Sequence, residues 1–174
     1  NLFGLIQYEA NAIAPGKRML SSMTPLIVLR NGKFAFTVGT PGGPTIITTN
    51  LQIFLNMAEW GMNIREAIDA RRFHHQWLPD RIQFERFALS PDTLLHLSGR
   101  GYTLQQVNSI GCAAGIQTME DGLLAGYADG RGEVYKAVGV AALGGGQQAF
   151  QQLGGVDVAH VGRLQASPEP GPFF

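Results

Sequence analysis

The sequence predicts an α+β fold, in which helices pack on a mostly antiparallel sheet. Short β-rich runs occur in neighbouring pairs joined by turn residues, which is typical of antiparallel hairpins. Two helical segments follow one another between these runs, so strands and helices do not alternate as they would in βαβ repeats. The chain has 174 residues, 45% of them hydrophobic, which is enough for one sizeable core.

The first predicted element is a hairpin. The runs from Leu26 to Arg30 and from Phe34 to Gly39 are β-rich. Asn31-Gly32 lies between them, and both of these residues tolerate the positive φ angles of a tight turn. The second strand is therefore expected to deliver the chain into Thr40-Pro41-Gly42-Gly43.

Two consecutive helices are predicted next. The first is expected to begin at Pro44, because proline suits the first helical position, and to end at Gly61. Asn63 and Glu66 have the spacing of a capping box and predict a second helix to about Arg71. The core face of the first helix is expected to carry the apolar residues spaced three or four apart: Ile47, Leu51, Phe54, Leu55 and Ala58.

The remaining elements are shorter and are punctuated by glycine and proline. They are a loop over 72–80, a strand over 81–86, a helix from Ser90-Pro91 to Gly99 or Gly101, a strand over 102–107, and two apolar core strands, 112–119 and 123–128, that flank Glu120-Asp121-Gly122. Residues 141–174 are rich in glycine, glutamine and proline and are expected to form a disordered tail. The predicted domain therefore covers residues 1–140.

Composition excludes several classes of function. Thirteen basic and thirteen acidic residues give a formal net charge of zero, which offers no electrostatic footprint for nucleic acid. No apolar run reaches the roughly 20 residues of a membrane span. Cys112 is the single cysteine, so no disulfide within the chain and no multi-cysteine zinc site is expected. No cofactor is expected either, because the chain has neither a P-loop nor a dinucleotide-binding glycine motif.

Adjacent histidines, His74 and His75, suggest a metal site at first sight. In an extended chain, however, neighbouring side chains point to opposite sides, and no further ligand stands at a suitable spacing. We therefore expect packed, hydrogen-bonded histidines and no bound metal.

The strongest chemical signal is the pair Gly42-Gly43 between a strand end and a helix start. Glycines there leave backbone N–H groups open to an anion or to a developing oxyanion. An ordinary tight turn uses the same residues, so the local pattern leaves both interpretations open.

Three motifs, in order along the chain, carry a resemblance to a known family. They are Pro15-Gly16-Lys17-Arg18-Met19-Leu20-Ser21-Ser22-Met23-Thr24-Pro25, Gly39-Thr40-Pro41-Gly42-Gly43, and Arg72-Phe73-His74-His75-Gln76-Trp77-Leu78-Pro79. With Asp129-Gly130-Arg131 near the end, they resemble the small subunit of the γ-glutamyltranspeptidases, also called glutathione hydrolases, over residues 1 to about 140.

The resemblance implies an N-terminal-nucleophile hydrolase fold, an αββα sandwich with antiparallel sheets between helical layers, incomplete in this fragment. It also implies acyl transfer through an N-terminal threonine, from glutathione or a related γ-glutamyl compound to an amino acid, a peptide or water. Gly42 and Gly43 would form the oxyanion hole with their N–H groups, and Ser21 and Ser22 would bind the α-carboxylate of the substrate. The implied partners are the large subunit and the N-terminal part of the small subunit. The implied location is the periplasm or the cell exterior.

The nucleophilic threonine of the family lies upstream of the segment that matches residues 1–25. Asn1 cannot replace it, because an amide is not a nucleophile. We therefore expect the fragment alone to be inactive. The alternative is a non-catalytic chain that binds γ-glutamyl or other amino-acid carboxylates, or that assembles with a large-subunit-like partner.

Overall fold

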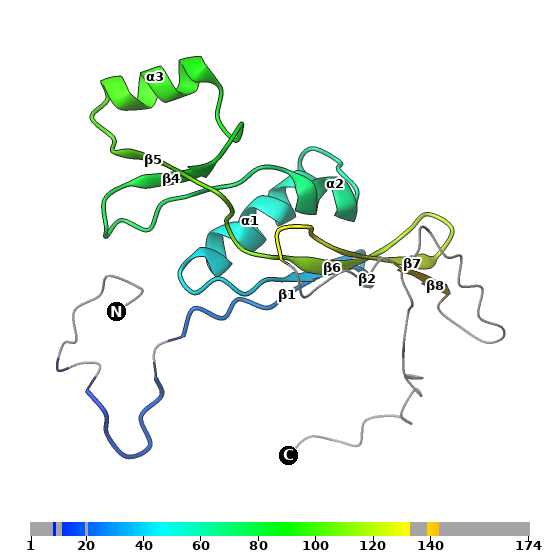
Figure 1. Ribbon diagram of the computed structural model, residues 1–174. Coiled ribbons are helices and arrows are strands. Elements are labelled where there is room, and N and C mark those ends of the chain that lie inside the picture. Colours follow the sequence, from blue (N-terminus) through cyan, green and yellow to red (C-terminus); the bar gives the residue numbers. More distant parts are fainter. Residues whose placement is uncertain (1–8, 10–11, 20, 133–138, 143–174) are drawn as a thin grey trace.

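The computed structural model describes residues 9, 12–19, 21–132 and 139–142. Its larger part is a five-stranded antiparallel sheet in the order β1-β2-β6-β7-β8. These strands are β1 (Leu26–Arg30), β2 (Lys33–Gly39), β6 (Ala114–Thr118), β7 (Leu123–Ala128) and β8 (Gly139–Ala142). Two helices, α1 (Thr45–Ala58) and α2 (Ile64–Asp69), lie on one face of this sheet (Figure 1).

The smaller part is a three-stranded sheet in the order β3-β4-β5, with a third helix beyond it (Figure 1). Its elements are β3 (Phe73–His74), β4 (Ile82–Glu85), α3 (Pro91–Gly99) and β5 (Leu104–Val107). β4 and β5 are parallel, so β4, α3 and β5 form one βαβ unit. The sequence predicts the strands of this unit but not their parallel pairing, and it places β3 in a loop because two residues show no periodicity.

Both predicted hairpins are confirmed. Asn31 and Gly32 have φ angles of 53° and 75° and connect antiparallel β1 and β2. Gly122 has a φ angle of 81° between antiparallel β6 and β7. β8 then adds a fifth strand, in which Ala141 and Ala142 pair with residues of β7. The remainder of the predicted tail, residues 143–174, lies outside the described residues.

The helix starts also agree with their sequence signals. Pro44 has helical dihedral angles, φ −60° and ψ −27°, directly before α1. In α2 the Asn63 side chain accepts a hydrogen bond from the Glu66 N–H at 3.0 Å, and the Glu66 carboxylate accepts one from the Asn63 N–H at 3.0 Å. This reciprocal pair is the predicted capping box.

The predicted core face of α1 is wrong for Ile47, Leu51 and Ala58. Ile47 and Leu51 are each 51% exposed, Ala58 is also exposed, and only Phe54 and Leu55 of that set are half-buried. The residues that α1 buries are Thr49, Asn50, Ile53 and Met57. α1 is apolar on more than one side, so apolar spacing alone does not identify the side that meets the sheet.

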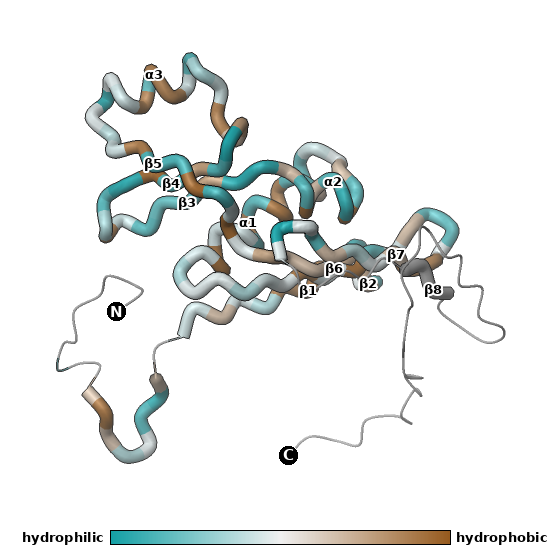
Figure 2. The backbone as a smooth tube through the Cα atoms, in the orientation of Figure 1, coloured by the Kyte–Doolittle hydropathy of each residue, from teal (hydrophilic) through white to brown (hydrophobic). Residues whose placement is uncertain are grey.

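The core lies where α1 and α2 meet the larger sheet, and Figure 2 shows apolar segments of chain on both sides of this junction. It consists of Phe36, Val38, Ile53, Met57, Ile64, Ala67, Ile68 and Ala113. Two of these residues come from β2 and five from the helices that cover it, so the core fixes the start of α1 against the end of β2. That junction contains Gly42 and Gly43.

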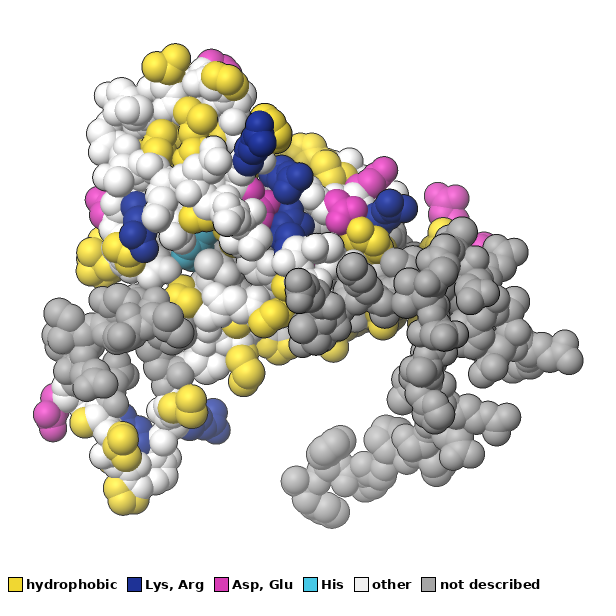
Figure 3. All heavy atoms as spheres, viewed as in Figure 1, with side chains coloured by type: hydrophobic (Ala, Val, Ile, Leu, Met, Phe, Trp, Pro, Cys, Tyr) yellow, Lys and Arg dark blue, Asp and Glu magenta, His cyan; other side chains and the backbone are white. Residues whose placement is uncertain are grey.

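The opposite face of the larger sheet carries no helix among the described residues (Figure 1). Ile27, Thr37 and Ile116 lie side by side across β1, β2 and β6 on this face. Ile27 is 71% exposed and Ile116 is 42% exposed, and Figure 3 shows hydrophobic side chains beneath the sheet. Ile116 is therefore an exception to the prediction that 112–119 is an apolar core strand, whereas the residues of 123–128 are half-buried. We call the row Ile27, Thr37 and Ile116 the open sheet face.

Candidate active site

The glycine turn connects the end of β2 to the start of α1. Gly42 has a φ angle of 149° and Gly43 one of 56°, a region that favours glycine. The Gly42 carbonyl accepts hydrogen bonds from the N–H of Thr45 at 3.1 Å and from its hydroxyl at 3.0 Å. A Cβ atom at Gly42 would lie 2.5 Å from Thr45 Oγ1, so this position has no room for a side chain.

The two glycine N–H groups differ from the carbonyls of the same turn. Both carbonyl oxygens accept hydrogen bonds, from Thr45, Ile46 and Ser22. Neither the Gly42 N–H nor the Gly43 N–H donates a hydrogen bond to a described residue. Two adjacent unused donors at a helix start suit an oxygen that carries negative charge.

The loop that contains the predicted serine pair contacts this turn. The Ser22 hydroxyl donates a hydrogen bond to the Gly43 carbonyl at 3.0 Å, although the two residues are 21 positions apart. The neighbouring Ser21 hydroxyl accepts a hydrogen bond from the Met23 N–H at 3.2 Å. The structure thus brings the two predicted pairs, Ser21-Ser22 and Gly42-Gly43, into one place.

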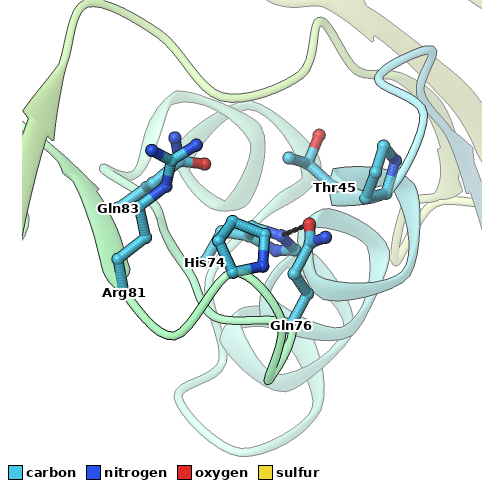
Figure 4. Close-up of a pocket in the computed structure, with 7 residues that line it drawn as sticks. Thr45, His74, Gln76, Arg81 and Gln83 are labelled. Carbon is cyan, nitrogen blue, oxygen red and sulfur yellow. Dashed lines mark hydrogen bonds between the residues drawn. The ribbon is translucent and has the colours of Figure 1, made fainter. Parts of the chain in front are cut away.

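Both histidines have hydrogen-bond partners, as predicted, but only His74 is buried, so the prediction of packed histidines is wrong for His75. His74 is 2% exposed, and its ring lies between the Thr48 hydroxyl, at 2.7 Å from Nδ1, and Gln76 Oε1, at 2.8 Å from Nε2 (Figure 4). His75 is exposed and its Nε2 lies 3.1 Å from Asp80 Oδ1. Within the described part of the chain, no three His, Cys, Asp or Glu side chains come together as a metal site would require.

A buried ion cluster lies behind the turn, and the sequence analysis did not predict it. We use this name for Arg72, Glu85, Asp129 and Arg131. Arg72 Nη2 lies 3.0 Å from Asp129 Oδ2, and the side chains of these two residues are 1% and 0% exposed. Arg131 holds Glu85 with two hydrogen bonds, of 2.7 and 2.8 Å. The sequence signals were indirect: Arg72 opens the third family-like motif, and Asp129 and Arg131 stand in the closing segment.

The buried ion cluster also fixes the backbone beside the glycine turn. Arg72 donates to the Ile110 carbonyl at 2.7 Å, and Glu85 accepts from the Ile110 N–H at 2.8 Å. Two residues further along, the Cys112 N–H donates to the Thr40 hydroxyl at 2.9 Å. Segment 110–112 therefore connects the cluster to the first residue after β2.

Charge balance keeps the cluster ionised. Burial alone raises the pKa of Glu85, but hydrogen bonds from Arg131, the Ile110 N–H and the Arg72 N–H outweigh it and hold that pKa below its ordinary value. Burial likewise lowers the pKa of Arg131, and the carboxylates of Glu85 and Asp129 more than reverse this effect. Two cations and two anions are thus enclosed together, but burial and the nearby Arg131 lower the pKa of Arg72, and its Nε has no hydrogen-bond partner among the described residues.

The fold is similar to those of solved γ-glutamyltranspeptidases. A mutant γ-glutamyltranspeptidase from Helicobacter pylori is similar over 76% of this chain and 73% of its own, with a TM-score of 0.70 and 44% sequence identity. The γ-glutamyltranspeptidase from Pseudomonas nitroreducens, in complex with L-DON, is similar over 79% and 72% of the two chains, with a TM-score of 0.69 and 38% identity. The fold is accordingly that of the N-terminal-nucleophile hydrolases, as predicted.

Sequence comparisons identify the family. The family model for gamma-glutamyltranspeptidase matches residues 1–139, and the chain belongs to this family. A glutathione hydrolase proenzyme from Pseudomonas sp. (strain A14) is 60% identical over 93 residues, 53% of this chain and 16% of the relative. The glutathione hydrolase proenzyme of Escherichia coli (strain K12) is 45% identical over 131 residues, 75% of this chain and 22% of the relative. The chain therefore spans about a fifth of the length of these relatives.

Among the helices of the described residues, none has both the length and the hydrophobicity that a membrane span requires.

Proposed function

We propose that this chain supplies the oxyanion-binding turn and part of the carboxylate site of an enzyme that transfers or hydrolyses γ-glutamyl groups. The substrate class is glutathione and related γ-glutamyl compounds, in line with the names of the relatives. The observation that carries the proposal is the hydrogen bond from the Ser22 hydroxyl to the Gly43 carbonyl, beside two glycine N–H groups without a partner among the described residues.

In this mechanism the γ-glutamyl carbonyl lies against the turn. The N–H groups of Gly42 and Gly43 donate to the oxygen that becomes negative when the carbonyl is attacked, which lowers the energy of the transition state more than that of the substrate. The attacking hydroxyl is the N-terminal threonine that the family resemblance implies, and it is not among the residues described here. The acyl-enzyme then transfers its γ-glutamyl group to an amine or to water.

The two serines are expected to have different roles in binding the α-carboxylate. Ser22 already gives its one hydroxyl hydrogen to Gly43, whereas the Ser21 hydroxyl accepts from Met23 and donates to no described residue. Ser21 therefore has a hydrogen available for the substrate carboxylate, and Ser22 holds the turn in position.

Ser21→Ala, in the full polypeptide encoded with this chain, is expected to raise KM for a γ-glutamyl anilide roughly tenfold with little change in kcat, because a hydrogen bond to a charged group is lost. Ser22→Ala is expected to lower kcat as well, because Gly43 loses its support. Steady-state kinetics of aniline release from the γ-glutamyl anilide check both variants. The proposal fails if the unaltered protein releases no aniline, and the division of roles fails if the two variants behave alike.

We further propose that the open sheet face packs against a second sheet, supplied by the rest of the enzyme. Two observations support this proposal. The row Ile27, Thr37 and Ile116 exposes two isoleucine side chains to water. The family resemblance also implies a four-layer sandwich, in which two sheets pack face to face. The isolated 174-residue chain is then expected to bind a hydrophobic dye and to unfold without a cooperative transition. A soluble monomer that unfolds cooperatively and binds no dye would show that the second sheet is not needed.

A further inference from the structure

The two N–H groups that the proposed function assigns to the oxyanion belong to two consecutive peptide groups. The Gly42 N–H shares a peptide group with the Pro41 carbonyl, and the Gly43 N–H shares one with the Gly42 carbonyl. Both peptide groups are trans. A trans peptide group is planar, so its carbonyl and its N–H point in opposite directions and rotate together. Whatever holds these two carbonyls therefore also sets the direction of the two donors.

The Pro41 carbonyl is held by the side chain of Thr40. The Thr40 hydroxyl donates a hydrogen bond to this carbonyl at 2.7 Å, and no other described residue donates to it. The same hydroxyl accepts a hydrogen bond from the Cys112 N–H at 2.9 Å, although Cys112 is 72 positions away. Gly111 leaves room for this approach, because a Cβ atom there would lie 2.8 Å from Thr40 Oγ1. The hydroxyl is thus fixed both by what it donates to and by what it accepts.

The Gly42 carbonyl is held by the first residue of α1. Thr45 donates to this carbonyl twice, from its N–H at 3.1 Å and from its hydroxyl at 3.0 Å. The peptide group that carries the Gly43 N–H is therefore attached to the start of a helix. The peptide group that carries the Gly42 N–H is attached to Thr40 and, through Thr40, to segment 110–112.

The contacts of Thr40 also strengthen the donor on the far side of its peptide group. A hydrogen bond accepted by a carbonyl polarises the whole peptide group, so hydrogen bonds in a row reinforce one another. The row here begins at the Cys112 N–H, passes through the Thr40 hydroxyl to the Pro41 carbonyl, and ends at the Gly42 N–H. Each group donates to the next, and the final donor is the one that the proposed function directs at the oxyanion.

We propose that Thr40 and Thr45 are positioning residues, whose hydroxyls direct the two oxyanion donors of the glycine turn. The inference rests on the proposed function. Each hydroxyl has its one hydrogen committed to a carbonyl, so it acts on the oxyanion only through the N–H of the same peptide group. No bond forms or breaks at either threonine. Since an oxyanion develops both when the acyl-enzyme forms and when it is consumed, loss of either hydroxyl should slow both steps.

Thr40→Val, in the full polypeptide encoded with this chain, is the main test, because valine keeps the shape of threonine and removes the hydroxyl. We expect kcat for aniline release from a γ-glutamyl anilide to fall roughly tenfold with KM nearly unchanged, because a misdirected donor weakens the transition state more than the bound substrate. Thr40→Ser keeps the hydroxyl and should recover most of kcat. Thr45→Val should lower kcat only about threefold, since the Thr45 N–H still holds the Gly42 carbonyl.

Thr118→Val is the matched control. The Thr118 hydroxyl also donates to a backbone carbonyl, that of Phe34, at 3.1 Å. Thr118 is the last residue of β6, whereas the glycine turn follows Gly39, which pairs with Ala114 at the other end of the same strand. This variant loses a hydrogen bond of the same kind, so kcat should stay unchanged. Urea unfolding of all variants shows how much of any change in kcat accompanies a loss of stability.

The outcomes separate this inference from the function on which it rests. Aniline release by the unaltered protein, with equal kcat values for Thr40→Val and Thr118→Val, overturns the positioning role and leaves the proposed function intact. A loss of kcat that Thr40→Ser does not reverse, or a rise in KM alone, overturns it as well. Absence of aniline release from the unaltered protein overturns both. If Thr40→Val does not fold, Thr45→Val decides the question, and a kcat equal to that of Thr118→Val overturns the proposal.

Discussion

Gly42→Ala is expected to lower the rate of γ-glutamyl transfer roughly 100- to 1,000-fold, the usual loss when an oxyanion donor is removed. Gly42 has a φ angle of 149°, which side chains of L-residues rarely allow, and its added Cβ atom would lie 2.5 Å from Thr45 Oγ1. The turn must therefore move, and both N–H donors move with it. Since these donors act on the transition state, kcat should fall much more than KM rises.

Gly39→Ala supplies the control for this experiment. Gly39 is an exposed glycine three residues earlier, and no atom lies within 4 Å of the position that its Cβ would take. Its φ angle is not in the positive region. The rate of aniline release from a γ-glutamyl anilide is measured for both variants. If Gly42→Ala retains a kcat close to that of Gly39→Ala, the turn does not stabilise an oxyanion.

Local signals explain which parts of this fold were predictable. The Asn31-Gly32 turn and the pair Asn63 and Glu66 act within three residues, so their sequence determines their geometry directly. Gly42 and Gly43 belong to the same group, because backbone freedom between a strand and a helix is a local property. Their approach to Ser22 is not local, and the family-like motifs, rather than spacing, indicated it.

The incorrect predictions concern contacts between residues that are far apart in the sequence. Arg72 and Asp129 are 57 positions apart, and nothing in a single sequence pairs a particular arginine with a particular aspartate. The faces of α1 present a similar problem. Ile47 and Leu51 are apolar and spaced as core residues are, yet they are exposed here, whereas the polar Thr49 and Asn50 are buried. Burial of Asn50 depends on its 2.6 Å hydrogen bond to the Thr24 carbonyl, 26 residues away, which the periodicity of α1 does not contain.

The second large effect is expected from Arg72→Met, which should lower the free energy of unfolding by about 3–5 kcal/mol. Methionine keeps much of the side-chain volume but removes the cation that lies 3.0 Å from the fully buried Asp129 carboxylate. The variant also removes the hydrogen bonds that Arg72 donates to the carbonyls of Ile68 and Ile110, although Arg131 still donates to the Ile68 carbonyl. Arg131, 3.5 Å from Asp129, is then the cluster's one cation for two buried carboxylates, so an excess buried negative charge and two lost hydrogen bonds act in the same direction.

Arg71→Met is the control for Arg72→Met, because Arg71 is the exposed neighbour and its loss should change stability by no more than about 0.5 kcal/mol. Urea unfolding of the full polypeptide measures both. Adding Asp129→Asn to Arg72→Met should restore part of the loss, since asparagine removes the excess negative charge and keeps an oxygen for the Ala113 N–H. Equal stability of the Arg71 and Arg72 variants would show that the cluster does not support the fold.

The glycine turn depends on the same residues, because segment 110–112 is held by the cluster at one end and by Thr40 at the other. A stability loss from Arg72→Met without any loss of γ-glutamyl transfer would therefore separate the scaffold from the site.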